Sequence, residues 1–173
     1  MNQQELNKYF DTVWESKLDT YQYSGWSLKD KINFGERVLD VGCGFNEFKP
    51  HIPNLIGIDP ATEMADFKVS IENFRTDKKF DVAFCLGSIN FGDDQTIVHQ
   101  IQCVVDLLKP KSRIYWRCNP GFFDHDNDEC TKINFYPWTF EKQIEFCKRF
   151  DYQMVELKWD INKQRRIYAE WRR

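Results

Sequence analysis

The sequence lacks several features that would assign it to a membrane, disulfide-rich or nucleic-acid-binding class. No apolar run approaches the ~20 residues that a membrane-spanning helix needs, and residues 1–5 do not resemble a signal peptide. The six cysteines include no Cys-x-x-Cys pair, which indicates reduced, packed thiols. A formal net charge of -3 gives no general attraction to nucleic acid or anionic membranes. We therefore expect a cytoplasmic protein.

The composition is that of an ordinary globular protein. Its 173 residues are 42% hydrophobic and 29% charged, which favours one domain with a substantial core. We expect an N-terminal helical cap over residues 1–34 and an α/β core over residues 35–173. Apolar residues at helical spacing predict a helix over residues 4–18, interpreted as core packing, and Ser27 is a candidate N-cap for a short helix through Ile32.

The region that organises the chain is a short apolar run followed by a glycine-containing turn. Val38–Val41 is typical of a buried parallel strand, and Gly42 and Gly44 then permit positive φ and close approach of a ligand. Asp40, near the strand's carboxyl end, is expected to point towards the crevice where α/β sheets bind ligands. Glu47 takes the place of the third glycine of a dinucleotide site, where its carboxylate would repel a pyrophosphate.

A second apolar strand follows the glycine turn. Leu55–Ile58 ends in the single acid Asp59, which is followed by Pro60. An acid at this place can accept hydrogen bonds from both hydroxyls of a ribose, as in other nucleoside-binding α/β folds. The two strands together predict a nucleoside-containing ligand that carries positive or zwitterionic charge near the glycine turn.

Val38–Gly44 followed by Ile56–Asp59 resembles motifs I and II of the class I S-adenosylmethionine-dependent methyltransferases. The resemblance covers roughly residues 35 to 170, with Asn46 in place of the family's third glycine. It implies a doubly wound, mostly parallel α/β sheet of the seven-stranded type, with an antiparallel last strand and helices on both faces. It also implies S-adenosyl-L-methionine as cofactor and S-adenosyl-L-homocysteine as product.

The remaining segments fit this order. We predict a brief helix before Pro53, and further strands at residues 65–72, 80–86 and 113–118. A helix capped by Asp93 or Asp94 is expected to end at Lys109–Pro110. A helix over residues 140–150 and a hairpin of residues 152–159 and 164–171 complete the chain.

The resemblance also suggests which residues form the site. The expected cofactor-binding residues are Asp40, Gly42, Cys43, Gly44, Asp59, Pro60, Ser70, Ile71, Leu86, Gly87 and Ser88. Ser70 stands where many members have an adenine-binding acid, so the backbone of Ser70 and Ile71 is expected to serve instead. The candidate substrate-binding residues are Tyr21, Tyr23, Trp26, Asn90, Asn119 and Phe122.

Two further expectations concern the segment of residues 119–138. Its length and aromatic ends predict a lid that selects the acceptor together with the N-terminal stretch. The acidic cluster at residues 124–129 lacks the EF-hand spacing, so we interpret it as a solvated loop and predict no metal site. The sequence identifies no catalytic residue.

The function predicted from these features is S-adenosylmethionine-dependent methyl transfer to an unidentified acceptor. A small molecule or a protein side chain is favoured over nucleic acid, and no membrane partner is expected. One alternative is a non-catalytic S-adenosylmethionine-binding protein that acts through protein contacts. A nicotinamide-dependent oxidoreductase is a further alternative, which Glu47 disfavours. The sequence does not indicate an oligomeric state.

Overall fold

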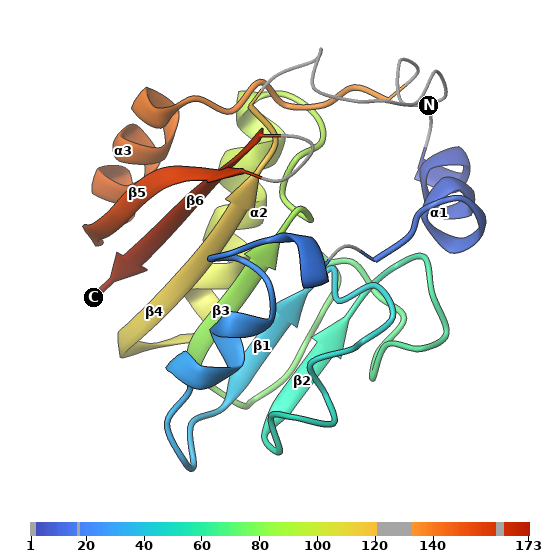
Figure 1. The fold of residues 1–173 in the computed structure, drawn as a ribbon, viewed down its shortest axis with the longest axis horizontal. Coiled ribbons are helices and arrows are strands. Elements are labelled where there is room, and N and C mark those ends of the chain that lie inside the picture. The colour runs from blue at the N-terminus through green and yellow to red at the C-terminus, as the bar shows by residue number, and fades with distance from the viewer. Residues whose placement is uncertain (1–2, 17, 121–132, 162–164) are drawn as a thin grey trace.

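The computed structural model describes residues 3–16, 18–120, 133–161 and 165–173 (Figure 1). The α-helices are α1 (Gln3–Thr12), α2 (Asp94–Leu107) and α3 (Phe140–Arg149), and the 3₁₀ helices are η1 (Leu18–Thr20) and η2 (Trp26–Lys31). The strands are β1 (Val38–Val41), β2 (Leu55–Ile58), β3 (Phe80–Leu86), β4 (Leu108–Cys118), β5 (Gln153–Ile161) and β6 (Arg165–Arg172). Among the described residues, no helix has the length and apolar character that crossing a bilayer requires.

The six strands form one sheet in the order β2-β1-β3-β4-β6-β5. Strands β2, β1, β3 and β4 pair in parallel, whereas β6 is antiparallel to both β4 and β5. The chain leaves β1 for β2 on one side and then returns to β3 on the other side. This order confirms the predicted doubly wound sheet with its antiparallel last strand, although the described residues form six strands where seven were expected.

The prediction of a strand over residues 65–72 is wrong. The segment makes only an isolated parallel bridge, between Phe67 and Ile58 of β2. The carboxylate of Asp66 accepts a hydrogen bond from the Gly57 amide at 2.8 Å, so a side chain takes a donor at this edge of β2. Backbone hydrogen bonds to the Ser70 carbonyl then close a turn. The alternating pattern did not reveal the Asp66 contact and the turn at Ser70, which limit pairing with β2 to this bridge.

The two faces of the sheet have separate cores. On one face, Leu39 of β1 and Trp116 of β4 lie in a cluster with the apolar sides of α2 and α3. On the other face, Phe84 and Tyr115 pack against Leu28 of η2 and against the turns that follow β1. Figure 1 shows α2 behind the sheet and η2 in front of it. Helices therefore cover both faces as predicted, but the second face carries a 3₁₀ helix.

Several element boundaries differ from the predicted ones. Helix α1 ends at Thr12 instead of residue 18, and residues 45–51 form turns in place of the brief helix. Ser27 does not cap η2, because its hydroxyl donates to the carbonyl oxygens of the preceding loop. The residue before η2 is Gly25, where a Cβ would lie inside 3.0 Å of two backbone oxygens. Asp93 does cap α2, as predicted, by accepting from the Thr96 amide.

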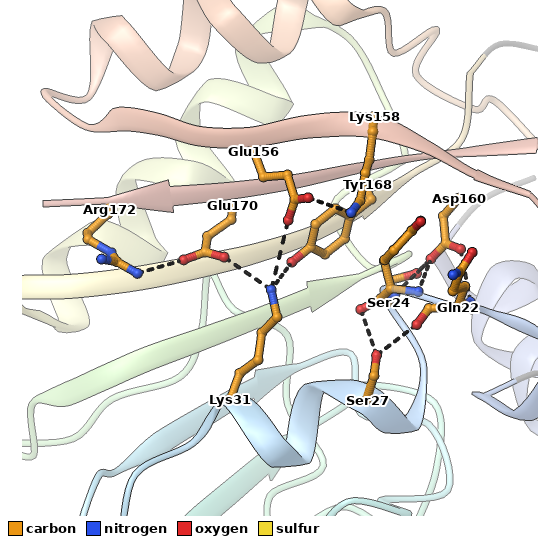
Figure 2. Close-up of polar contacts among 11 residues, drawn as sticks. Gln22, Ser24, Ser27, Lys31, Glu156, Lys158, Asp160, Tyr168, Glu170 and Arg172 are labelled. Carbon is orange, nitrogen blue, oxygen red and sulfur yellow. Dashed lines mark hydrogen bonds and ion pairs between the residues drawn. The ribbon is translucent and has the colours of Figure 1, made fainter.

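Polar contacts tie the N-terminal loop to strands β5 and β6 (Figure 2). The Lys31 ammonium donates to the Tyr168 hydroxyl at 2.9 Å and to Glu170 at 3.3 Å. Further along the same strands, the fully buried carboxylate of Asp160 accepts from the backbone amides of residues 22–24 and from the Ser24 hydroxyl. These contacts hold the loop across the second face of the sheet and place Tyr21 above the ends of the strands.

Candidate functional site

A cavity of about 630 Å³ lies at the carboxyl ends of β2, β1, β3 and β4. The residues that follow these strands form its floor, and one side of α1 forms its roof. Figure 1 shows α1 beyond the carboxyl ends of β1 and β2. The loops after β1 and β3 diverge at this point because their chains continue to opposite sides of the sheet. Such a switch point is where open α/β sheets bind ligands.

The glycine turn forms the centre of the cavity floor. Gly42 and Gly44 have φ angles of 68° and 54°, which L side chains rarely adopt. Asn46 has φ 56°, so it accommodates the left-handed conformation that Asn tolerates best among non-glycine residues. A Cβ on Gly44 would lie 2.9 Å from the indole ring of Trp14. The turn therefore presents bare backbone to the cavity.

Asp59 lies at the end of β2 with its carboxylate fixed in place. One oxygen accepts from the Gly44 amide at 3.0 Å, and the other accepts from the Ala61 amide at 2.7 Å. The side chain lines the cavity although the residue is only 8% exposed. Because each carboxylate oxygen has a second lone pair, the pair can still accept two hydroxyl donors. Pro60 lies next to it in the lining.

Ser70 and Ile71 line the same end of the cavity. Thr96 and Gln100 of α2 also line it, and sequence reasoning did not identify them. Glu72 accepts from the Gln100 amide nitrogen at 2.6 Å. This contact fixes the orientation of the Gln100 side chain, whose Oε1 is buried without a hydrogen-bond partner. Thr96 and Gln100 lie one turn apart on α2, a spacing that places them on one face of the helix but does not indicate what that face contacts.

The segment after β3 forms the next part of the lining. Leu86, Gly87 and Ser88 all contact the cavity, and the Ser88 hydroxyl is buried without a partner. Asn90 is 1% exposed and lies behind the lining, where its Oδ1 accepts from the Asn119 amide at 3.2 Å. Asn119 itself lines the cavity. The structure therefore gives Asn90 a supporting position and brings Asn119 to the surface of the cavity.

Asp40 and Cys43 do not line this cavity. They border an adjoining space of about 40 Å³ on the other side of the glycine turn. Asp40 is fully buried, and loss of hydration raises the pKa of its carboxyl from 3.8 to about 7, although the positive charge of Arg117 opposes the shift. Burial likewise raises the pKa of the Cys43 thiol. Both residues therefore border the smaller space, which shares Trp14, Gly42, Leu86 and Arg117 with the lining of the main cavity.

The N-terminal aromatic residues separate into two groups. Tyr21 lines the cavity, with its ring over the guanidinium of Arg117 at 4.3 Å. Tyr23 instead stacks on Tyr168, and Trp26 packs against the Phe48 ring, so both belong to the second core. Phe122, the remaining substrate-binding candidate, lies outside the described residues.

The stripe on α1, interpreted from sequence as core packing, forms the roof. Tyr9 and Phe10 lie with Phe91, Ile133 and Phe135 in a small apolar cluster at the cavity. The rings of Phe10 and Phe91 pack edge-to-face, with their centroids 5.5 Å apart. The sequence pattern correctly indicated an apolar face, but it carried no information on what that face covers. Residues 121–132 of the expected lid, including the acidic cluster at 124–129, lie outside the described residues.

Two arginines complete the lining at the β4 and β6 side, and sequence reasoning missed both. Arg117 is the penultimate residue of β4, and Arg166 is the second residue of β6. Both are buried, with exposures of 9% and 7%. Within the described ranges, no three acidic, histidine or cysteine side chains gather as a metal site would require.

Comparisons of the sequence with protein-family models and with curated proteins give no match. Comparison of the fold does give matches. The Synechocystis PCC 6803 magnesium protoporphyrin IX methyltransferase with bound S-adenosylhomocysteine superposes with a TM-score of 0.72 at 11% identity, covering 98% of both chains. An S-adenosylmethionine-dependent methyltransferase from Clostridium acetobutylicum gives 0.65 at 15% identity, covering 98% of this chain and 97% of that one.

A smaller share aligns with the Burkholderia thailandensis 1,6-didemethyltoxoflavin-N1-methyltransferase, solved with its substrate and S-adenosylhomocysteine. The TM-score is 0.63 at 13% identity, over 80% of this chain and 71% of that chain. At sequence identities this low, the superpositions establish a shared fold and do not establish a shared activity. On the strand order and these superpositions, the chain has the Rossmann-like fold of the class I S-adenosylmethionine-dependent methyltransferases.

Proposed function

We propose that this protein is an S-adenosylmethionine-dependent methyltransferase that acts on a small molecule. The observation that carries the proposal is the Asp59 carboxylate, held by two backbone amides at the edge of a cavity that also contains a bare glycine turn. A preorganised acceptor for two hydroxyls beside exposed backbone is the arrangement that a ribose and an attached amino-acid chain require. Glu47 takes the place of the third glycine of a dinucleotide site, which disfavours a pyrophosphate, and its carboxylate accepts from the Ser16 hydroxyl beside the turn.

The lining residues fit this cofactor from end to end. Asp59 would hold the ribose hydroxyls, and Gly42 and Gly44 would let the methionine part lie against the backbone. The adenine would lie against Ile71, where Gln100 Oε1 is a buried acceptor without a donor. The buried Ser88 hydroxyl, also without a partner, would face the sulfonium end of the molecule. The cavity therefore supplies an acceptor for the ribose hydroxyls at Asp59 and one for the adenine amine at Gln100.

When bound, S-adenosylmethionine supplies an activated methyl group for an in-line displacement. The protein has to hold the acceptor atom in line with that group, and positioning alone can contribute much of the rate. The roof of α1 and the Tyr21 side chain would exclude water from the transfer site. The described histidines, His51 and His99, lie outside the lining, so no imidazole base is assigned.

A small-molecule acceptor suits the cavity better than a protein side chain or nucleic acid. The roof covers the floor, and the volume of about 630 Å³ is within the usual range for small-molecule pockets. Two of the superposed enzymes are named for small acceptors, magnesium protoporphyrin IX and 1,6-didemethyltoxoflavin. These names support the class of acceptor and leave its identity open.

Calorimetric titration with S-adenosylhomocysteine tests the proposal at Asp59. Replacing Asp59 by Ala is expected to weaken binding by about 1.5 to 3 kcal/mol, the range for hydrogen bonds to a charged group. Glu63→Ala is the matched control, because Glu63 follows on the same loop, has an 84% exposed side chain and lies outside the lining. It is expected to bind like the wild type. Equal affinity of a folded Asp59→Ala variant would disprove the proposed ribose contact.

A further inference from the structure

Arg117 is a buried cation without a carboxylate partner. Its guanidinium donates to the carbonyl oxygens of Ser24 at 3.0 Å and Leu86 at 2.9 Å, and both of these acceptors are uncharged. Within the described residues, no ion pair joins Arg117 to an acid. A guanidinium has five N–H donors, so the fork retains donors beyond these two bonds. Removing a charge from water without pairing it is costly, which makes such a residue a strong candidate for binding an anion.

Two acids lie near Arg117, and within the described residues neither forms an ion pair with it. Asp160 contributes a favourable field, but its carboxylate is already held by the amides of residues 22–24 and by the Ser24 hydroxyl (Figure 2). Asp40 also contributes a favourable field and borders, together with Arg117, the small space beside the glycine turn. The contacts made by Asp160 fix Ser24, and Ser24 in turn fixes Arg117. The guanidinium is therefore held rigidly before any ligand arrives.

The position of Arg117 separates it from the proposed cofactor contacts. Those contacts follow β2, β1 and β3, whereas Arg117 belongs to β4, Asn119 directly follows β4, and Arg166 belongs to β6. In the sheet order, β4 and β6 come next after β3, so these residues extend the cavity beyond the expected transfer point at Leu86–Ser88. A Cβ on Gly87 would lie 4.0 Å from an Arg117 nitrogen, which places the guanidinium beside that point.

The rest of this end of the cavity has both a positively charged side chain and aromatic side chains in its lining. Arg166 adds a second positive charge to the lining, and its field on Arg117 is repulsive. Two like charges brought together in a buried site are stabilised when an anion binds between them or beside them. The apolar roof of Tyr9, Phe10, Phe91 and Phe135 faces the same cavity. The lining thus combines a cationic end with an aromatic wall.

We propose that Arg117 binds an oxyanion of the methyl acceptor, so that the acceptor is a small molecule with a carboxylate or phosphate group and an apolar body. The inference rests on the proposed function, since it assigns the acceptor side of the same cavity. The planar fork of Arg117 matches both oxyanions, which it can bind through parallel N–H donors. Arg117 is a substrate-positioning residue in this account, and Arg166 adds to the positive field.

Calorimetry on the full chain saturated with S-adenosylhomocysteine tests the inference, with benzoate, phenyl phosphate and benzamide as probes. Benzamide has nearly the shape of benzoate without its charge. We expect at least one anion to bind saturably and benzamide to bind at least tenfold more weakly. Arg117→Gln is expected to weaken anion binding about tenfold or more. Arg117→Lys keeps the charge but not the planar pair of donors, so its anion affinity should lie between those of the wild type and Arg117→Gln.

Arg113→Gln is the control. Arg113 lies on the same strand, pairs with Glu36 at 2.7 Å and is absent from the cavity lining, so its loss should leave anion binding unchanged. If no probe binds the loaded wild-type protein, or if benzamide binds as tightly as the anions, the inference is wrong. These wild-type comparisons hold even where the Arg117→Gln variant fails to fold.

A second titration determines whether Arg117 binds an oxyanion of the acceptor or the carboxylate of the cofactor. If Arg117→Gln weakens binding of S-adenosylhomocysteine but not of 5′-methylthioadenosine, which lacks the amino-acid carboxylate, then Arg117 binds the cofactor and the inference fails. Unchanged affinity for both nucleosides is the expected result. Absence of S-adenosylhomocysteine binding in the wild type would instead refute the proposed function, and the inference with it.

Discussion

Gly42 and Ser88 lie against each other across the centre of the cavity floor, joining the loop after β1 to the loop after β3. A Cβ on Gly42 would lie inside 3.0 Å of the Ser88 Cβ, and Gly42 has a φ of 68°. Two independent features therefore require glycine here: the positive φ and the lack of space for a Cβ beside Ser88. Its position couples the turn that would hold the methionine part to the segment beside the transfer point.

Replacing Gly42 by Ala should therefore destabilise the protein more than the same change at a glycine with free space around it. Gly35 is the matched control, because its φ is 87° and a Cβ there meets nothing within 4 Å. We expect Gly35→Ala to lower the free energy of unfolding by about 1 to 2 kcal/mol from the backbone alone. Gly42→Ala should lose a further ~1 to 3 kcal/mol from overpacking. Urea unfolding measures both, and equal losses would contradict the packing described here.

Gln100 is expected to accept a hydrogen bond from the exocyclic amine of adenine. Replacing it by Leu removes the buried Oε1 acceptor, so affinity for S-adenosylhomocysteine should fall about tenfold, the effect of one lost hydrogen bond to a buried group. Gln102→Leu is the control, since Gln102 is exposed and bonds only to Asp106 of the same helix. Titration with S-inosylhomocysteine, which lacks the exocyclic amine, should show little difference between wild type and Gln100→Leu. A large difference there would assign Gln100 a structural role only.

Asp40 should make the stability of the protein depend on pH in an unusual direction. Its pKa is about 7 in the folded protein and close to 3.8 when unfolded, because burial disfavours the charge. Between these values the folded state holds a proton that the unfolded state has released. This contribution to stability is therefore present at low pH and is lost as the pH rises towards 7.

The Asp40→Asn variant isolates this effect, because the amide resembles the protonated acid and cannot titrate. Relative to wild type it should gain stability between pH 4 and pH 8, by a total on the order of 4 kcal/mol. Other carboxylates with basic or backbone partners, such as Asp66 and Asp81, have lowered pKa values and act in the opposite direction, but they are shared by both proteins. Parallel stability curves for the two proteins would show that Asp40 is not buried as described.

Much of the fold was predictable because its signals are local. The runs Val38–Val41, Leu55–Ile58 and Phe80–Leu86 are short and almost wholly apolar, as buried parallel strands must be, and all three are strands in the structure. The resemblance of the first two to known motifs then supplied the order of the sheet. The prediction for residues 65–72 failed because the Asp66 side-chain contact and the turn at Ser70 limit pairing with β2 to an isolated bridge.

The site was less predictable, because its residues meet only through the tertiary fold. Asp59, Gly42 and Gly44 could be named from sequence, since Asp59 and Gly42 directly follow strands and Gly44 lies in the turn that begins at Gly42. Gln100 and Arg117 could not, because helix α2 and strand β4 bring them in from distant parts of the chain. The α1 aromatics have the periodicity of any amphipathic helix, so a roof over a cavity cannot be told from a core contact.

The most direct test of the central claim is a comparison of ligand classes on the wild-type protein. S-adenosylhomocysteine and NADH should be titrated separately by calorimetry, with thermal unfolding as a second readout. The account predicts saturable binding of S-adenosylhomocysteine, with about 2.7 kcal/mol of added stability at ~100 times its dissociation constant. It predicts no binding of NADH, because Glu47 follows the glycine turn. Binding of NADH together with failure to bind S-adenosylhomocysteine would contradict it.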